Sequence, residues 1–194
     1  MSELPIEVHP WEPWAPDGAR VLMLGTFPPG RHRWSMDFYY PNPTNDFWRI
    51  IGLLFEGDPL ALWIAAEKRF DLARIQQLTT VHGIAMSDTC VRIRRLQNNA
   101  SDKYLEVVEP RNIAGLTEQM PALTDIVATG EKASTLLAEA TDTAVPKIGE
   151  YNLWQFLGRT IRLWRLPSTS RAYPLALKAK AEFYLKMFKT ANIL

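Results

Sequence analysis

Two short segments of the sequence combine residue types that could bind a nucleobase and its phosphates. In the first, residues 25–48, a glycine–proline turn leads into cations, tyrosines and amides. Aromatic faces stack bases, and guanidinium groups contact phosphate oxygens. The second segment, residues 166–173, places three hydroxyl side chains beside a proline, which suits short donors facing phosphate. Taken by residue type alone, the glycine–proline turn at residues 25–30 is only a rigid loop.

Three motifs make the interpretation more specific. GTFPPG, YYPNPTNDFW and LPSTSRAY follow one another across most of the chain, and the series resembles that of the uracil-DNA glycosylase superfamily. The resemblance is closest to the branch that includes the hypoxanthine-DNA glycosylases and the mismatch-specific enzymes. It implies an enzyme that flips a uracil- or hypoxanthine-type base from double- or single-stranded DNA and hydrolyses the N-glycosidic bond in base excision repair. None of the three motifs contains a lysine for a Schiff base, so we expect a monofunctional glycosylase.

The resemblance implies that Asn45 is the catalytic residue. Most members of the superfamily carry Asp or Asn in the first motif to position the attacking water, and that place here holds Phe27, whose ring cannot orient water by hydrogen bonding. The hypoxanthine-type branch is thought to use an asparagine in its second segment, which corresponds to Asn45. From residue type alone, Asn45 is the N-cap of the helix that follows, and one side chain could do both.

The resemblance also implies a base-binding set. Tyr40 corresponds to the aromatic position on which the flipped base stacks, with Phe27 near it and the turn residues Gly25 and Thr26 beside the base. Asp88 follows the second expected strand, where the superfamily reads the Watson–Crick edge. An ionised carboxylate only accepts hydrogen bonds, so Asp88 should favour a base that presents an N–H, as uracil and hypoxanthine do.

Structural alternatives to these base-binding roles come from residue type alone. Tyr40 would then be an ordinary packing aromatic. Asp88 would cap a helix or pair with one of three arginines, and those arginines could equally form a basic strip near DNA: Arg92, Arg94 and Arg95.

The LPSTSRAY segment resembles the superfamily loop that enters the minor groove and compresses the phosphates. The DNA-binding residues implied here are Ser168, Thr169, Ser170 and Arg171. Related loops begin with a histidine or asparagine that stabilises the leaving base, and Leu166 stands at that position. By the structural alternative, Arg171 is a solvated surface charge.

Two rival functions follow from the departures from the motifs and from the chemistry itself. Because Phe27 and Leu166 stand where polar residues are expected, the chain could be a lesion-binding module that kept the fold and lost catalysis. It could also be an N-glycosidase acting on free nucleosides or nucleotides.

Composition limits the partners and cofactors. The chain has 22 basic and 21 acidic residues, a formal charge of +1, so a polyanion must meet a local patch. The single cysteine, Cys90, excludes an internal disulfide and a four-cysteine metal site, and suggests a half-buried thiol. His9, His32 and His82 lack metal-ligand spacing, and we assign them no role. No metal and no cofactor are expected.

The ends and length of the chain suggest how it is organised. The N-terminus has neither a basic start nor an apolar h-region, and no apolar run is long enough to cross a bilayer. We expect a cytoplasmic monomer without a membrane partner. Residues 1–194 should form a single domain with an extended, proline-rich arm at residues 1–19.

Strands that alternate with helices should position these motifs. The expected fold is an α/β three-layer sandwich, with a central, mainly parallel four-stranded sheet flanked by helices. The predicted strands are residues 20–24, 83–87, 125–129 and 160–164. The predicted helices start at residue 45, at the turn 130–133 and in the ranges 58–70, 72–78 and 174–190. Ligands bind such sheets beyond the carboxyl ends of the strands, where the motifs lie.

Overall fold

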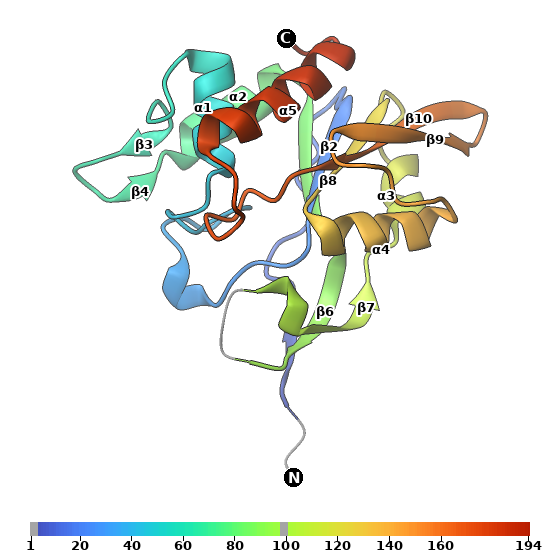
Figure 1. Ribbon diagram of the computed structural model, residues 1–194, viewed down its shortest axis with the longest axis horizontal. Coiled ribbons are helices and arrows are strands. Elements are labelled where there is room, and N and C mark those ends of the chain that lie inside the picture. Colours follow the sequence, from blue (N-terminus) through green and yellow to red (C-terminus); the bar gives the residue numbers. More distant parts are fainter. Residues whose placement is uncertain (1–3, 98–100) are drawn as a thin grey trace.

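The computed structural model describes residues 4–97 and 101–194, and a five-stranded sheet lies at its centre (Figure 1). The spatial order is β5 (Ile84–Asp88), β2 (Val21–Gly25), β8 (Asp125–Thr129), β10 (Arg159–Leu166) and β9 (Glu150–Phe156). The first four strands are parallel, and β9 is antiparallel to β10. The four-strand prediction therefore missed β9. This edge strand is nowhere fully buried, and it lacks the continuous apolar run that identified the others.

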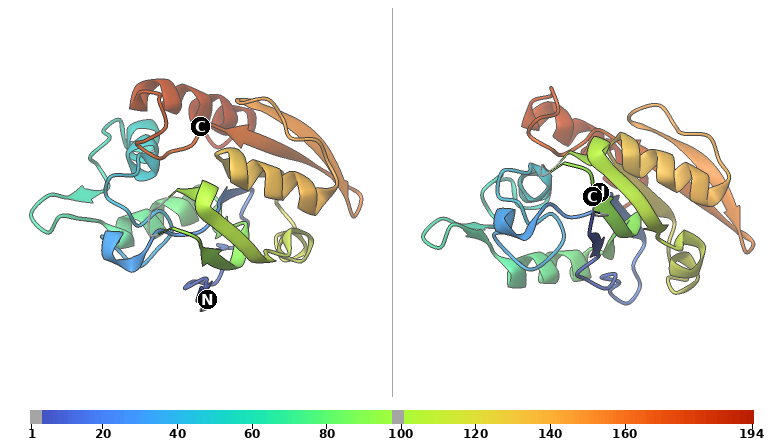
Figure 2. Two further views of the ribbon diagram at one scale, coloured as in Figure 1. Left: turned by 60° about the horizontal axis from the view of Figure 1, so that its bottom comes forward. Right: turned by 90° about the horizontal axis from the view of Figure 1, so that it is seen from below.

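Successive residues of the central strands face opposite layers, and helices cover both faces (Figures 1 and 2). Val21 and Met23 pack on the side of α1 (Phe47–Glu56), α2 (Leu72–Val81) and α5 (Leu177–Thr190). Leu22 and Leu24 pack on the side of α3 (Ile113–Glu118) and α4 (Glu131–Thr141). This is the three-layer arrangement expected from the alternation of strands and helices.

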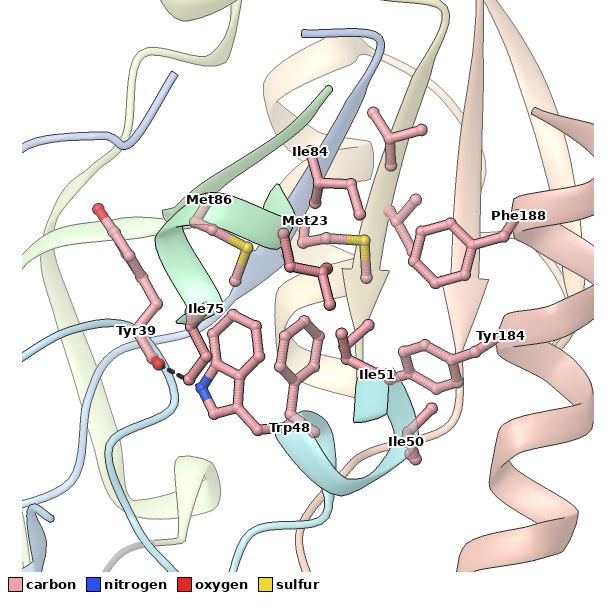
Figure 3. Close-up of a cluster of buried hydrophobic side chains, with 14 of the residues drawn as sticks. Met23, Tyr39, Trp48, Ile50, Ile51, Ile75, Ile84, Met86, Tyr184 and Phe188 are labelled. Carbon is pink, nitrogen blue, oxygen red and sulfur yellow. Dashed lines mark hydrogen bonds between the residues drawn. The ribbon is translucent and has the colours of Figure 1, made fainter. Parts of the chain in front are cut away.

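Large aromatic side chains fill the layer between the sheet and helices α1, α2 and α5 (Figure 3). Trp48, Tyr184 and Phe188 are essentially inaccessible to solvent. The Trp48 indole N–H donates to the Tyr39 carbonyl oxygen at 2.9 Å, so the polar end of this buried ring is satisfied. The same bond attaches the tyrosine pair of the second motif to the core.

The helix predicted over residues 58–70 is wrong. Turns and a two-stranded hairpin, β3 (Trp63–Ile64) with β4 (Arg69–Phe70), occupy this range. The Asp58 carboxylate accepts from the Leu60 N–H at 2.9 Å, a local bond that competes with helix formation. Lys68 turns the hairpin with a φ of +52°.

A second, antiparallel sheet was not predicted. Its order is β1 (Ile6–Val8), β6 (Cys90–Arg95) and β7 (Leu105–Pro110), with a single 3₁₀ turn, η2 (Asp102–Tyr104), just before β7. The proline-rich arm supplies β1, and farther along it Trp14 forms a bridge to Met86 of β5. The described part of the arm thus pairs with a strand of each sheet, while its residues 1–3 lie outside the described range.

The remaining boundaries shift by a few residues. The first helix starts at Phe47, the last at Leu177, and α2 extends to Val81. The cations after the glycine–proline turn form a short 3₁₀ turn, η1 (Arg31–Arg33). Within the described residues, no helix is long and apolar enough to cross a membrane.

Candidate active site

The carboxyl ends of four parallel strands bring the motifs together. Gly25 ends β2, Asp88 ends β5, Thr129 ends β8 and Leu166 ends β10. Register places Gly25 beside Asp88 and Leu166 beside Thr129. Segments from four distant parts of the chain therefore meet at the edge of the sheet where ligands bind in open α/β folds.

Gly25 allows two side chains to approach the end of β2. A Cβ atom added there would overlap the Asp88 Oδ1 atom and lie 3.3 Å from the Tyr40 hydroxyl oxygen. The absence of a side chain is thus a condition for the contact between these residues. Tyr40 and Asp88 therefore meet at Gly25, and all three belong to the predicted base-binding set.

Tyr40 is held from two sides. Its hydroxyl lies 2.7 Å from Thr129 Oγ1, and its ring stacks on Phe47 with a centroid distance of 3.8 Å and an interplanar angle of 7°. Its φ of +52° is unusual for a tyrosine and turns the chain sharply before the asparagine segment. Burial, reinforced by the charge of Asp88, raises the pKa of Tyr40 well above its usual value. The hydroxyl therefore stays protonated.

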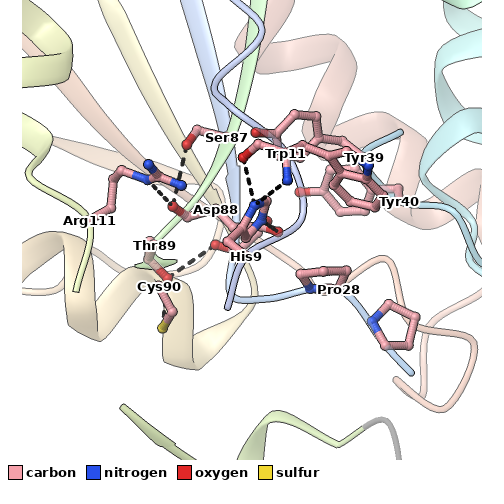
Figure 4. A network of polar contacts seen from close by, with 12 residues as sticks. His9, Trp11, Pro28, Tyr39, Tyr40, Ser87, Asp88, Thr89, Cys90 and Arg111 are labelled. Atoms are coloured by element: carbon pink, nitrogen blue, oxygen red, sulfur yellow. Dashed lines mark hydrogen bonds and ion pairs between the residues drawn. The ribbon is translucent and has the colours of Figure 1, made fainter. Parts of the chain in front are cut away.

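The carboxylate of Asp88 pairs with His9 (Figure 4). His9 Nε2 lies 2.9 Å from Asp88 Oδ2, and the two side chains are 1% and 8% exposed. The Arg111 guanidinium reaches the Asp88 backbone carbonyl at 3.5 Å. The three arginines proposed as partners pair with glutamates: Arg92 with Glu109, Arg94 with Glu106 and Arg95 with Glu7.

Thr26 and Phe27 continue from the end of β2 toward the second sheet. The Thr26 hydroxyl donates to Asp102 Oδ2 at 2.7 Å. The pKa of Asp102 is raised by burial, an effect that this hydrogen bond partly offsets. The Phe27 ring packs against Cys90 and lies edge-on to His9 at 5.4 Å. Phe27 therefore borders His9, and Tyr40 lies near Asp88, the partner of His9.

Asn45 lies at the start of α1. The N-cap position is Asp46, one residue later than predicted, yet Asn45 Oδ1 accepts from the Phe47 N–H at 2.8 Å. The prediction that Asn45 is the N-cap is therefore wrong, although its side chain still accepts a hydrogen bond from the first N–H of the helix. An amide oxygen has a second lone pair and the amide nitrogen two donors, so this bond leaves the Asn45 side chain with hydrogen-bonding capacity for a water molecule.

Asp46 joins the two motif loops. Its N–H donates to the Thr169 carbonyl at 2.9 Å, and its carboxylate accepts from Lys180 at 2.9 Å and from Arg171 at 3.3 Å. Lys180 is fully buried and also donates to the Ser170 carbonyl at 2.8 Å. This buried network fixes the YYPNPTNDFW segment against the LPSTSRAY segment.

Local hydrogen bonds shape the loop after β10. Ser168 Oγ accepts from the Ser170 N–H at 3.2 Å, and Ser170 Oγ accepts from the Ala172 N–H at 3.3 Å. Thr169 is buried, whereas Ser170 and Arg171 are exposed. The loop thus presents a hydroxyl and a guanidinium to solvent beside the end of the sheet. Leu166 is fully buried and carries out no polar chemistry.

Comparison with known proteins identifies the fold. No family model and no curated protein matches the sequence. The structure is similar to a solution NMR structure of a candidate uracil DNA glycosylase from Methanosarcina acetivorans, with a TM-score of 0.61 and 20% identity over 95% of this chain and 99% of that chain. The chain has the fold of that protein.

Several residues near the site were not found by sequence reasoning. His9 was assigned no role, and Asp46, Asp102, Arg111 and Lys180 were not considered. His9 follows β1 and Asp102 lies in η2 before β7, beside a sheet whose strands were not predicted, so no signal linked them to the site. Asp46 could have been found, because it lies inside a motif and next to Asn45.

Metal and thiol chemistry gain no support from the geometry. Among residues 4–97 and 101–194, no group of His, Cys, Asp and Glu side chains could hold a metal ion. Cys90 is fully buried, more than predicted, and burial raises its pKa to about 11. It remains a thiol at neutral pH and makes a poor nucleophile.

Proposed function

We propose that the chain is a monofunctional DNA glycosylase of the uracil-DNA glycosylase superfamily, in the hypoxanthine and mismatch-specific branch. The observation that carries the proposal is convergence. The LPSTSRAY motif lies far from the other two in the sequence, yet it meets YYPNPTNDFW at Asp46 and Thr169. Asp88, from a third part of the chain, meets the two earlier motifs around Gly25 and Tyr40. The similarity in fold to the Methanosarcina protein supports the superfamily, and the branch rests on the motifs.

In the proposed reaction, DNA presents a flipped base to the carboxyl end of the sheet. The base stacks near Tyr40 and Phe27, beside the backbone of Gly25 and Thr26. Asp88 accepts a hydrogen bond from an N–H at the Watson–Crick edge. Such a site favours deaminated bases, because uracil carries N3–H and hypoxanthine N1–H where cytosine and adenine have acceptors.

Asn45 would orient the water that attacks C1′ as the base leaves. The hydrogen bond from the Phe47 N–H fixes the side-chain amide of Asn45, and Phe47 in turn stacks on Tyr40. The water-orienting amide and the stacking ring are thus coupled through one residue. An abasic site in an intact strand is the expected product.

The exposed part of the LPSTSRAY loop would hold the DNA strand. Ser168 and Ser170 would contact phosphates through their hydroxyl groups, and Arg171 would supply charge. Thr169, which is buried, would support the loop through the bond from the Asp46 N–H to its carbonyl. Asp46 neutralises part of that charge at 3.3 Å. We expect the protein to act as a cytoplasmic monomer on double- or single-stranded DNA.

The activity is tested with oligonucleotides that carry uracil, hypoxanthine, xanthine or a mismatch, followed by alkaline cleavage of abasic sites. The proposal predicts cleavage of at least one deaminated substrate. Deoxyuridine and inosine serve as controls, and hydrolysis of these alone would favour a nucleoside N-glycosidase. Lesion binding without cleavage would favour the noncatalytic module, whose supporting observation is that Phe27 and Leu166 are apolar and packed.

A further inference from the structure

The N-terminal arm delivers His9 to the end of β5. Strand β1 pairs with β6 in the register Ile6 with Arg94 and Val8 with Arg92, and the His9 N–H donates to the Val91 carbonyl at 2.8 Å. Because β6 follows β5 after a single residue, this pairing brings the next side chain of the arm beside Asp88.

The imidazole of His9 is fixed in orientation. Its Nδ1 lies 2.8 Å from the Trp11 carbonyl oxygen and 3.2 Å from the Trp11 amide nitrogen, while the ring stacks on Tyr39 at 5.7 Å. Its Nε2 faces Asp88 Oδ2. A carboxylate offers only lone pairs to this nitrogen, so the contact requires a proton on Nε2.

The contact with His9 gives the two carboxylate oxygens of Asp88 different neighbours. Oδ2 is engaged by His9, whereas Oδ1 lies against the backbone of Gly25, near the Tyr40 hydroxyl. Oδ1 is therefore the oxygen that faces the base-binding set. Without the donor from His9, the carboxylate could rotate, and Oδ1 would lose its fixed direction.

We propose that His9 is the positioning residue that aims Asp88 at the N–H of the flipped base and so sets the base specificity. The inference rests on the proposed glycosylase function. It assigns to the N-terminal arm, which lies outside the three motifs, a part in selecting the substrate.

The test compares a base with an N–H and its N-methylated counterpart. Rates are measured under single turnover for uracil and 3-methyluracil, or hypoxanthine and 1-methylhypoxanthine, in single strands so that base pairing affects neither. In wild type the N–H base should react faster. His9→Leu should lower this rate ratio by about tenfold or more, since a hydrogen bond to a charged group is lost. His9→Gln, which keeps a donor, should retain most of the ratio.

His82→Leu is the matched control. His82 follows α2 at the opposite end of β5 from Asp88, so this variant should keep the wild-type ratio. A folded His9→Leu variant with an unchanged ratio would overturn the proposal. So would an equal fall in both rates, because it would indicate a general structural effect.

An NMR measurement on wild type covers the case in which His9→Leu fails to fold. Long-range ¹H–¹⁵N spectra should show a proton on His9 Nε2 and a shift of its signal when uracil-containing DNA binds. An unprotonated Nε2, or no response to DNA, would contradict the inference. Failure of the glycosylase function itself would be seen separately, as wild type inactive on every base.

Discussion

Gly25 is the residue on which the proposed base site depends most directly. It belongs to a β strand, where glycine is usually unfavourable, but it leaves room for Asp88 Oδ1 and the Tyr40 hydroxyl. The contact explains why the GTFPPG motif begins with this residue. It also means that Gly25 and Asp88 should not vary independently.

Gly25→Ala should therefore destabilise the protein by about 1–3 kcal/mol, the usual cost of overpacking a buried site. Urea unfolding measures this cost. The control is the same substitution in an Asp88→Ala background, where the overlapping oxygen is gone and the cost should be smaller. Equal costs in both backgrounds would show that the Gly25–Asp88 contact does not limit the packing.

At the scale of elements, the buried pair between Asp46 and Lys180 attaches α5 to the start of α1. The Lys180 side chain is 0% and the Asp46 side chain 7% exposed, so removing one charge leaves the other without its buried partner. Lys180→Met should cost about 3–5 kcal/mol in the free energy of unfolding. It should also loosen the loop that holds Arg171.

Lys186→Met is the control for this prediction. Lys186 lies on the same helix and pairs with Glu150 at 3.1 Å, but both side chains are more than half exposed. Its loss should cost no more than about 1 kcal/mol. Chemical denaturation compares the two variants, and similar costs would argue against a structural role for the buried pair.

The central elements could be predicted because β2, β5 and β8 are short, largely apolar runs, and because β2 and β10 lead directly into the GTFPPG and LPSTSRAY motifs. β9 and the β3–β4 hairpin were missed, since edge strands and two-residue strands have little periodicity. The 58–70 helix was expected from an Asp-Pro start, but the same Asp58 side chain stabilises a turn. Local propensity alone could not decide between the two.

The candidate site was only partly predictable for a similar reason. Asp88 and Tyr40 could be placed by motif and strand order. The contact between His9 and Asp88, in contrast, depends on a pairing between residues 79 positions apart in the chain. Such pairing is set by the register of β1 on β6, which no local pattern reveals.

At the scale of the whole molecule, charge limits how the protein could bind DNA. A formal charge of +1 provides little general attraction, so individual cations near the site should account for the salt dependence. Arg171 is the proposed phosphate contact in the LPSTSRAY loop, and its side chain is 58% exposed.

Arg171→Ala should weaken DNA binding to all sequences alike and reduce the slope of log affinity against log salt concentration by about one. Fluorescence anisotropy at several salt concentrations measures the slope. Lys189→Ala is the matched control, because Lys189 lies in the last turn of α5. The Ala191 carbonyl just after this helix accepts from Arg20, which lies just before β2, at the edge of the sheet opposite the site. An unchanged slope for the Arg171 variant would remove this residue from the DNA interface.

The central claim, that Asn45 orients the water in a glycosylase, is tested by single-turnover release of the free base from DNA. Asn45→Ala should lower the rate by about 10²-fold or more, because the attacking water loses its orientation, while the lost bond from the Phe47 N–H costs only about 1 kcal/mol in stability.

Asn42→Ala is the matched control. Asn42 Oδ1 accepts from the Thr44 N–H at 3.0 Å, so this variant removes a comparable loop bond without the proposed catalytic group. The proposed role of Asn45 predicts base release by wild type and by Asn42→Ala, and its near absence in folded Asn45→Ala. Equal rates in all three, or no base released by wild type, would contradict it.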